Sequence, residues 1–141
     1  LNMETLWQQA YPSECVIVRP TGIYGTSVTR MIKLTETTKS YPKLHWSNRI
    51  HIDDLVAFLA HLLHVEHTEK SYICSNSQPL PLHEIIQWFQ QQLGLPVLVL
   101  ESAVSSGKQI HATRMQQMNF ELQHPHCFDD YLALLAERES K

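Results

Sequence analysis

Two short segments of this chain carry residue types that could take part in ligand chemistry. Residues 16–25 read Val-Ile-Val-Arg-Pro-Thr-Gly-Ile-Tyr-Gly, and residues 48–55 read Asn-Arg-Ile-His-Ile-Asp-Asp-Leu. The first segment is an apolar run that enters a turn at two glycines, which is typical of a buried strand and its loop. Because ligands of parallel sheets bind at the carboxyl ends of strands, we expect residues 19–24 to border the main cleft.

The second segment offers an imidazole and two carboxylates. Asp53 or Asp54 could cap the following helix, since a carboxylate there accepts free N–H groups and complements the helix dipole. His51 and Asp53 could instead form an acid/base pair. A structural role for these side chains is the competing hypothesis.

Nine histidines raise the question of a metal site. His61 and His64 are three residues apart, so they would share a helix face and could ligate one ion. Residues 124–127, His-Pro-His-Cys, form a second histidine cluster. A solvated helix end explains the first group more simply, because imidazoles are favoured near a helix C-terminus. We therefore expect no metal site.

The composition excludes several classes of protein. The chain has 141 residues, enough for about one domain, and is 43% hydrophobic and 18% charged, as in globular proteins. A net charge of -3 provides no basic surface for nucleic acid or for a membrane. The apolar run over residues 55–63 is too short to cross a bilayer, and residues 1–10 have no features of a signal peptide.

The cysteine pattern indicates a reducing environment. Cys15, Cys74 and Cys127 are an odd number of cysteines at wide spacing, so they predict neither a disulfide framework nor a zinc site. Cys15 and Cys74 fall in apolar, strand-like runs, where a buried free thiol is expected. We therefore expect a cytoplasmic protein.

Strand patterns alternate with helix patterns, which predicts an α/β fold with a partly parallel sheet. The strand-like runs are residues 14–19, 44–46, 71–75 and 96–100. The helical patterns are residues 3–10, 28–35, a segment beginning at 53 or 54, 83–93, 113–118 and 128–137. The apolar residues expected on their inner faces are Leu55, Phe58, Leu59, Leu62 and Leu63, then Ile85, Ile86 and Phe89, then Phe128, Leu132 and Leu135.

Seven phrases occur in an order that resembles one known family. They are residues 19–25, 48–54, 72–76, 107–110, 113–115, 119–120 and 125–130. Together they resemble the C-terminal half of the extended short-chain dehydrogenase/reductase family, the NAD(P)-dependent epimerases and dehydratases. Within that family they are most similar to a bacterial subgroup of small predicted epimerases.

The resemblance implies a fold class and a domain organisation. The fold would be α/β, the C-terminal part of a Rossmann-like doubly wound sheet plus the small substrate-binding lobe. Residues 1–141 would be a single C-terminal fragment. Residues 1–25 would end the nucleotide-binding sheet, and residues 26–141 would hold mixed sheet strands and the substrate lobe.

The resemblance also implies roles for individual residues. The cofactor-binding set, near the nicotinamide end, would be Pro20, Thr21, Gly22 and Ile23, and the substrate-lining set would be Tyr24, Trp46 and Arg49. His51 would pack structurally, as it usually does in the family. Many members that act on sugar nucleotides have Asn at the position of Gly22 and a phosphate-binding Arg near Ser47. Both departures argue against a nucleotide-sugar substrate.

Two motifs of the family are missing from this chain. The four glycines never take the spacing Gly-x-x-Gly-x-x-Gly, and none of the five tyrosines is followed four residues later by lysine. We therefore expect no catalytic residue here and interpret the chain as a fragment, inert alone, of a parent that uses NAD or NADP. The chain also lacks an initiator Met at position 1. A non-catalytic, reductase-like module that binds a ligand or a partner is the alternative.

The expected partners follow from the same interpretation. The parent would act on a small, sugar-like alcohol. Half of a doubly wound sheet would expose an apolar edge near Val16 and Tyr72, and such an edge promotes association. Family members commonly dimerise through the helix that would end near Ala10, so we expect a homodimer or other homo-oligomer with Leu6 and Trp7 near the contact.

Overall fold

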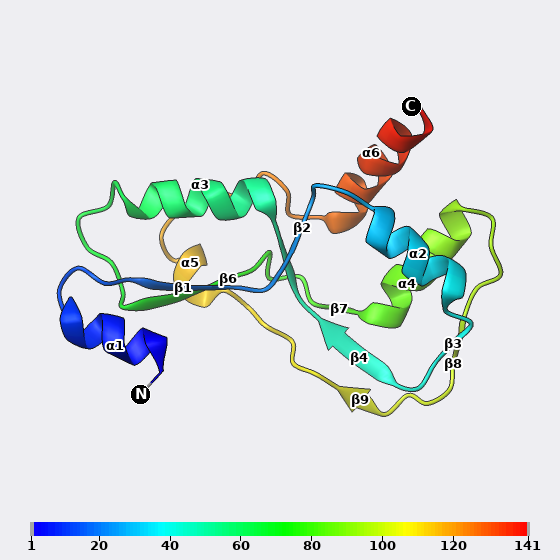
Figure 1. Cartoon of the computed structure of the whole chain (residues 1–141), viewed down its shortest axis with the longest axis horizontal. Helices are drawn as coiled ribbons and strands as arrows, with labels where there is room; N and C mark the ends of the chain where they lie inside the picture. The colour runs from blue at the N-terminus through cyan, green and yellow to red at the C-terminus, as the bar shows by residue number, and fades with distance from the viewer. Residues whose placement is uncertain (1, 141) are drawn as a thin grey trace.

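The computed structural model describes residues 2–140, in which helices and short strands alternate along the chain (Figure 1). The helices are α1 (Met3–Ala10), α2 (Thr29–Thr37), α3 (Ile52–Leu62), α4 (Leu82–Gln92), α5 (Thr113–Gln116) and α6 (Cys127–Glu139). The strands are β1 (Ile17–Pro20), β2 (Gly22–Tyr24), β3 (Ser40–Tyr41), β4 (Leu44–Ser47), β5 (Arg49–His51), β6 (Ser71–Cys74), β7 (Leu80–Pro81), β8 (Val99–Leu100) and β9 (Ser105–Ser106).

Most strand pairs are parallel, as the alternating pattern predicts. Strand β1 pairs with β6, β2 pairs with β5, and β3 pairs with β8, each in parallel. Strand β4 lies between β7 and β9, antiparallel to the first and parallel to the second. The predicted α/β class with a partly parallel sheet is therefore confirmed.

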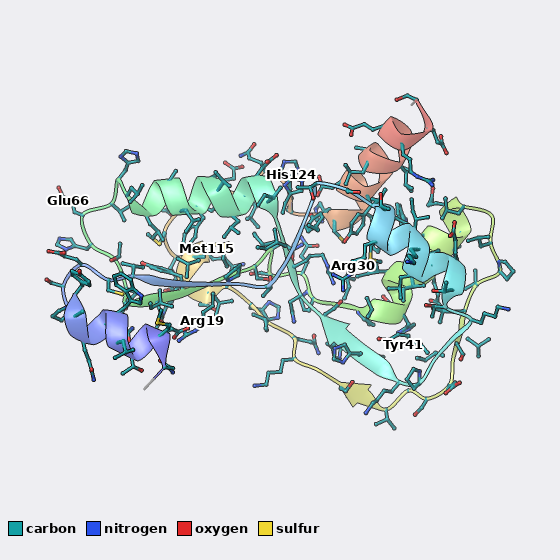
Figure 2. All side chains as sticks on the ribbon, viewed as in Figure 1. Arg19, Arg30, Tyr41, Glu66, Met115 and His124 are labelled. Carbon is teal, nitrogen blue, oxygen red and sulfur yellow. The ribbon has the colours of Figure 1, made fainter. Side chains whose placement is uncertain are left out.

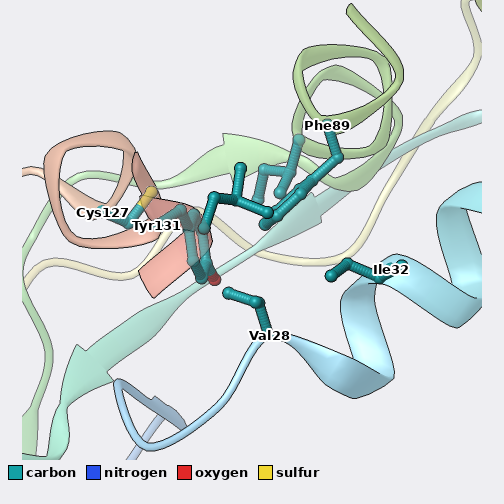
Figure 3. Packing of buried hydrophobic residues seen from close by; sticks show 7 residues of the cluster. Val28, Ile32, Phe89, Cys127 and Tyr131 are labelled. Atoms are coloured by element: carbon teal, nitrogen blue, oxygen red, sulfur yellow. The ribbon is translucent and has the colours of Figure 1, made fainter. Parts of the chain in front are cut away.

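One core cluster joins three helices at the right-hand end of Figure 1. Figure 3 shows its buried side chains, which come from α2 and the residue just before it, from α4 and from α6. Its members are Val28, Ile32, Ile85, Phe89, Cys127, Tyr131 and Leu135. The cluster confirms the inward face predicted for α4, on which Ile86 is also buried.

A second core cluster lies between α3 and the β1–β6 pair. Its buried members are Ile50, Leu55, Phe58, Tyr72, Cys74, Ala112 and Met115. The predicted inner face of α3 is only partly right, since Leu59 is 43% exposed and Leu63, just after the helix, is 83% exposed. The strands cover only one side of α3, so side chains on the edges of the predicted stripe stay in solvent.

Three sequence-based details differ from the structure. The α3 N-cap is His51, whose side chain accepts the Asp53 N–H, so neither aspartate caps the helix. Helix α5 ends at Gln116, two residues before the predicted end at residue 118. On α6, Leu132 is 53% exposed while Tyr131 is buried. The buried stripe of α6 is therefore rotated by one residue from the predicted one.

Helix α1 packs loosely on the rest of the chain. It has no buried residue, and Leu6 and Trp7 are 46% and 52% exposed. Arg19 of β1 pairs with Glu4 and thereby links the helix to the strand. The exposed apolar face of α1 fits the predicted self-association. No helix within residues 2–140 is long and apolar enough to cross a membrane.

We predict that the chain sediments as a dimer or larger species at tens of micromolar, a concentration at which interfaces of roughly −6 kcal/mol are populated. Trp7→Glu should shift the population toward monomer, because it places a charge in the apolar contact. Val104→Glu is the matched control, since Val104 is 68% exposed in another part of the fold. Wild-type sedimentation as a monomer, or equal effects of the two variants, would contradict the prediction.

Candidate functional site

A cleft of about 750 Å³ opens between the end of β2, the start of α2 and the start of β5. Residues 22–27 form one wall, and residues 47–49 form another. Leu82 and Ile85 of α4 and Tyr131 of α6 complete the lining. The cleft thus lies beside the first core cluster, whose Ile85 and Tyr131 hold its floor in place.

The structure brings four of the seven predicted site residues into this cleft. Gly22, Ile23, Tyr24 and Arg49 are among its lining residues, whereas Pro20, Thr21 and Trp46 are not. The backbone N–H and the hydroxyl of Thr21 both donate to the Cys74 carbonyl, which turns this residue toward β6. Trp46 lies opposite Pro81 in the β4–β7 pair. The cofactor and substrate roles of all seven stay predictions.

The parallel β2–β5 pair brings the two sequence segments together. Gly22 lies opposite Arg49, and Tyr24 lies opposite His51. The Gly22 N–H donates to the Asn48 carbonyl at 3.1 Å, and a Cβ on Gly22 would lie 3.1 Å from that same oxygen. An added side chain would therefore crowd the contact between the two segments, and the glycine avoids this.

The charged groups of the cleft are all cationic. Arg30 and Lys33 of α2 line it with Arg49 of β5, and no Asp or Glu is among the lining residues (Figure 2 labels Arg30). Arg49 is only 5% exposed and donates to Ser47 Oγ at 2.6 Å and to the Gln78 carbonyl at 3.4 Å. Sequence reasoning missed Arg30 and Lys33. Their spacing of three residues, which places both on one helix face, is the signal that could have found them.

A hydrogen-bonded cluster of polar side chains lies behind Tyr24. The Asp130 carboxylate accepts the Tyr24 hydroxyl at 2.6 Å and contacts His124 Nδ1 at 2.6 Å. The His124 ring stacks on the His51 ring, with centroids 3.6 Å apart and an interplanar angle of 7°. This cluster therefore connects the end of β2, the start of α3 and the first turn of α6.

Asp54 anchors the same loop from the other side. Its carboxylate is 1% exposed and accepts the backbone N–H groups of Gln123 and His124 at 2.8 and 2.9 Å. Buried carboxylates need such charge-assisted partners, and this one also lies in the first turn of α3, where the helix dipole favours a negative charge. Sequence reasoning found Asp54 but assigned it to helix capping.

The cluster does not have the geometry of a metal site. Ligand atoms of His51, His124 and Asp130 lie within 4.8 Å of one another, close enough to make them a candidate group. However, the two imidazoles are stacked in parallel, so their lone pairs do not converge. His51 Nδ1 also accepts the Asp53 N–H, and Gly25 covers the Nε2 edge of its ring. His61, His64 and His67 form no such candidate group within residues 2–140.

The acid/base alternative for His51 and Asp53 has weak geometric support. His51 Nδ1 lies 3.8 Å from the Asp53 carboxylate, too far for a hydrogen bond, and the imidazole is buried under Tyr24 and His124. This geometry favours the packing role for His51.

The titratable groups around Tyr24 have shifted pKa values. Burial and the hydrogen bond to Asp130 raise the pKa of Tyr24, and burial raises the pKa of Tyr131 to about 12. Both phenols are therefore neutral near pH 7. The hydrogen bond to Asp130 raises the pKa of His124 above the ordinary value of 6.5.

The fold and the cleft define the class of this protein as half of a Rossmann-like α/β protein. No protein-family model and no curated protein sequence matches the chain. A provisionally assigned NAD-dependent epimerase/dehydratase from Methylobacillus flagellatus is similar, with 29% identity and a TM-score of 0.72 over 95% of this chain and 52% of that one.

Two further solved structures share the fold at lower identity. A dTDP-glucose 4,6-dehydratase from Bacillus anthracis in complex with NAD is 14% identical, with a TM-score of 0.71 over 98% of this chain and 49% of that one. Vestitone reductase from alfalfa is 14% identical, with a TM-score of 0.62 over 96% and 48%. The chain therefore spans about half the length of the structures it matches. Its fold is similar to about half of these three structures, which is the likeness to extended short-chain dehydrogenases/reductases that the sequence segments predict.

We predict that the His124–Asp130 contact stabilises the fold more at low pH than at high pH. Because the folded-state pKa of His124 is raised, its contribution is fully present below pH 6.5 and is lost as the pH rises through the raised pKa. In urea unfolding, His124→Gln should lower the free energy of unfolding more at about pH 6 than at about pH 9. His67→Gln, at an exposed position, is the control and should show no such difference. A pH-independent effect of His124→Gln would disprove the contact's role.

We also predict that Gly25→Ala destabilises the protein strongly. Gly25 has φ +117°, and an added Cβ would overlap the buried ring of His51. Gly94→Ala is the matched control, because Gly94 has φ +67° but no atom within 4 Å of the added carbon. Both variants should lose about 1–3 kcal/mol to backbone strain, and Gly25→Ala should lose clearly more. Equal melting temperatures would show that the His51 packing is not restrictive.

Proposed function

We propose that this chain is the C-terminal, substrate-binding portion of an NAD(P)-dependent epimerase/dehydratase or reductase that acts on a small, sugar-like alcohol. The observation that carries the proposal is the match over 95% of the chain to the Methylobacillus flagellatus protein, assigned as an NAD-dependent epimerase/dehydratase. The cleft supports it, because it opens at the end of β2, where parallel sheets bind their ligands.

The cofactor belongs to the intact parent in this proposal. NAD or NADP would remove and return a hydride at the substrate alcohol. Within this chain, residues 20–23 would cover the nicotinamide end, and the exposed Gly22 and Ile23 leave room on that side. Tyr24 and Arg49 would hold the substrate, with Trp46 at the edge. The three free cysteines fit a reducing, cytoplasmic setting.

The chain alone would be inert. It has neither a Gly-x-x-Gly-x-x-Gly turn, which would bind the dinucleotide, nor a Tyr-x-x-x-Lys pair, which would exchange a proton with the substrate hydroxyl. The competing proposal is a non-catalytic module that keeps the cleft for ligand or partner binding.

The coding sequence upstream of Leu1 tests the proposed function. We expect it to encode the glycine-rich turn and the Tyr-x-x-x-Lys pair, and the extended protein to bind NAD(H) or NADP(H) in calorimetry. The 141-residue chain should not bind either cofactor at micromolar concentrations, since it lacks the phosphate-binding turn. Micromolar binding by this chain alone, or an upstream sequence without both motifs, would favour the non-catalytic module.

A further inference from the structure

The cleft carries more positive charge than a site for a neutral alcohol requires. Its 17 lining residues include Arg30, Lys33 and Arg49 but no carboxylate. The chain as a whole has a net charge of -3, so this concentration of cations is local. The charge pattern therefore points to a negative group on the ligand.

Arg49 is the strongest element of this pattern. Its guanidinium is buried yet forms no ion pair with any carboxylate within residues 2–140. Its hydrogen-bond partners, Ser47 Oγ, the Gln78 carbonyl and the Cys127 side chain, are not carboxylates. The guanidinium also lies close enough to lower the pKa of the phenol of Tyr131, another cleft residue. A buried cation without a counter-charge is costly, and a ligand anion would offset that cost.

The start of α2 adds to the positive electrostatic potential of the cleft. Helix α2 begins at the cleft, its first turn contains no acidic residue, and Val28 provides no side-chain cap; the Thr29 N–H donates to Ser27 Oγ at 3.1 Å, and the N–H groups of residues 30 and 31 have no hydrogen-bond acceptor within residues 2–140. Free N–H groups at a helix N-terminus favour anions. Arg30 and Lys33 lie on the same helix and are exposed. Within residues 2–140, neither forms an ion pair.

We propose that this cleft binds a carboxylate or phosphate group carried by a sugar-like alcohol, with Arg49 as the deep contact and with Arg30 and Lys33 at the rim. The inference that the ligand is a sugar-like alcohol rests on the proposed function. The inference that the ligand carries a negative group rests only on the charges of the cleft. Carboxylate and phosphate both accept paired N–H donors from a guanidinium, so the test must separate them.

Three matched polyols provide that separation: glucose, gluconate and glucose 6-phosphate. In NMR titrations of the ¹⁵N-labelled chain, we expect at least one of the two anions to shift the amide signals of residues 22–30. Glucose should bind at least about tenfold more weakly, a difference of about 1.4 kcal/mol. The anion affinity should also fall as salt is added, because the rim charges are screened.

The double variant Arg30→Gln/Lys33→Gln tests the rim without disturbing the core. It should weaken binding of the preferred anion about tenfold and leave glucose binding unchanged. Lys39→Gln/Lys43→Gln is the matched control, with the same loss of charge at exposed positions outside the cleft lining. Arg49→Lys, which keeps the charge, should retain more anion binding than Arg49→Met. A purely structural role for Arg49 would change the binding of glucose and anions alike.

The outcomes separate this inference from the proposed function. Equal affinity for glucose and both anions would overturn the inference and leave a substrate cleft for neutral alcohols. The absence of any shift with either anion would also overturn it, as would equal losses in the rim and control variants. If the anions bind as expected but the upstream motifs are missing, the proposed function fails while the anion site stands.

Discussion

The buried carboxylate of Asp54 is the interaction on which the arrangement of the two core clusters depends. It lies at the start of α3, which packs in one cluster, and it binds the backbone at residues 123 and 124, which leads into α6 in the other. Burying a carboxylate to 1% exposure is costly unless N–H groups donate to it, and these two N–H groups do so. The loop before α6 is therefore held against the start of α3.

The shape of the cleft depends on the contact between Asp54 and the loop at residues 123 and 124. With the loop in place, His124 stacks on His51 and Asp130 accepts the Tyr24 hydroxyl, which fixes one side of the cleft wall. Gly25 allows the turn after Tyr24 to pass directly over the His51 ring. The shape of the cleft and the packing of the fold thus share the same few contacts in this chain, since Tyr24 both lines the cleft and joins the polar cluster.

The cationic groups of the cleft come from two different parts of the sequence. Arg49 lies in the phrase that carries the family resemblance, but its significance comes from burial without a carboxylate partner. Arg30 and Lys33 lie in the variable segment between the two phrases and reach the same cleft because α2 begins at its edge. A site assembled from a variable segment and a family phrase is a natural place for substrate specificity to differ between relatives.

The sequence by itself determined the approximate order of helices and strands and the α/β class with a partly parallel sheet, because these follow from local hydrophobic patterns and from chain connectivity. It also located four of the residues that line the cleft. The tertiary structure alone decided that Asp54 binds residues 123 and 124, that Tyr131 and not Leu132 faces the core, and that Arg30 and Lys33 join Arg49. These outcomes depend on which surfaces meet between segments that are distant in the sequence, and no local periodicity encodes such contacts. Local patterns determine the helices and strands, and tertiary packing determines which of them become neighbours.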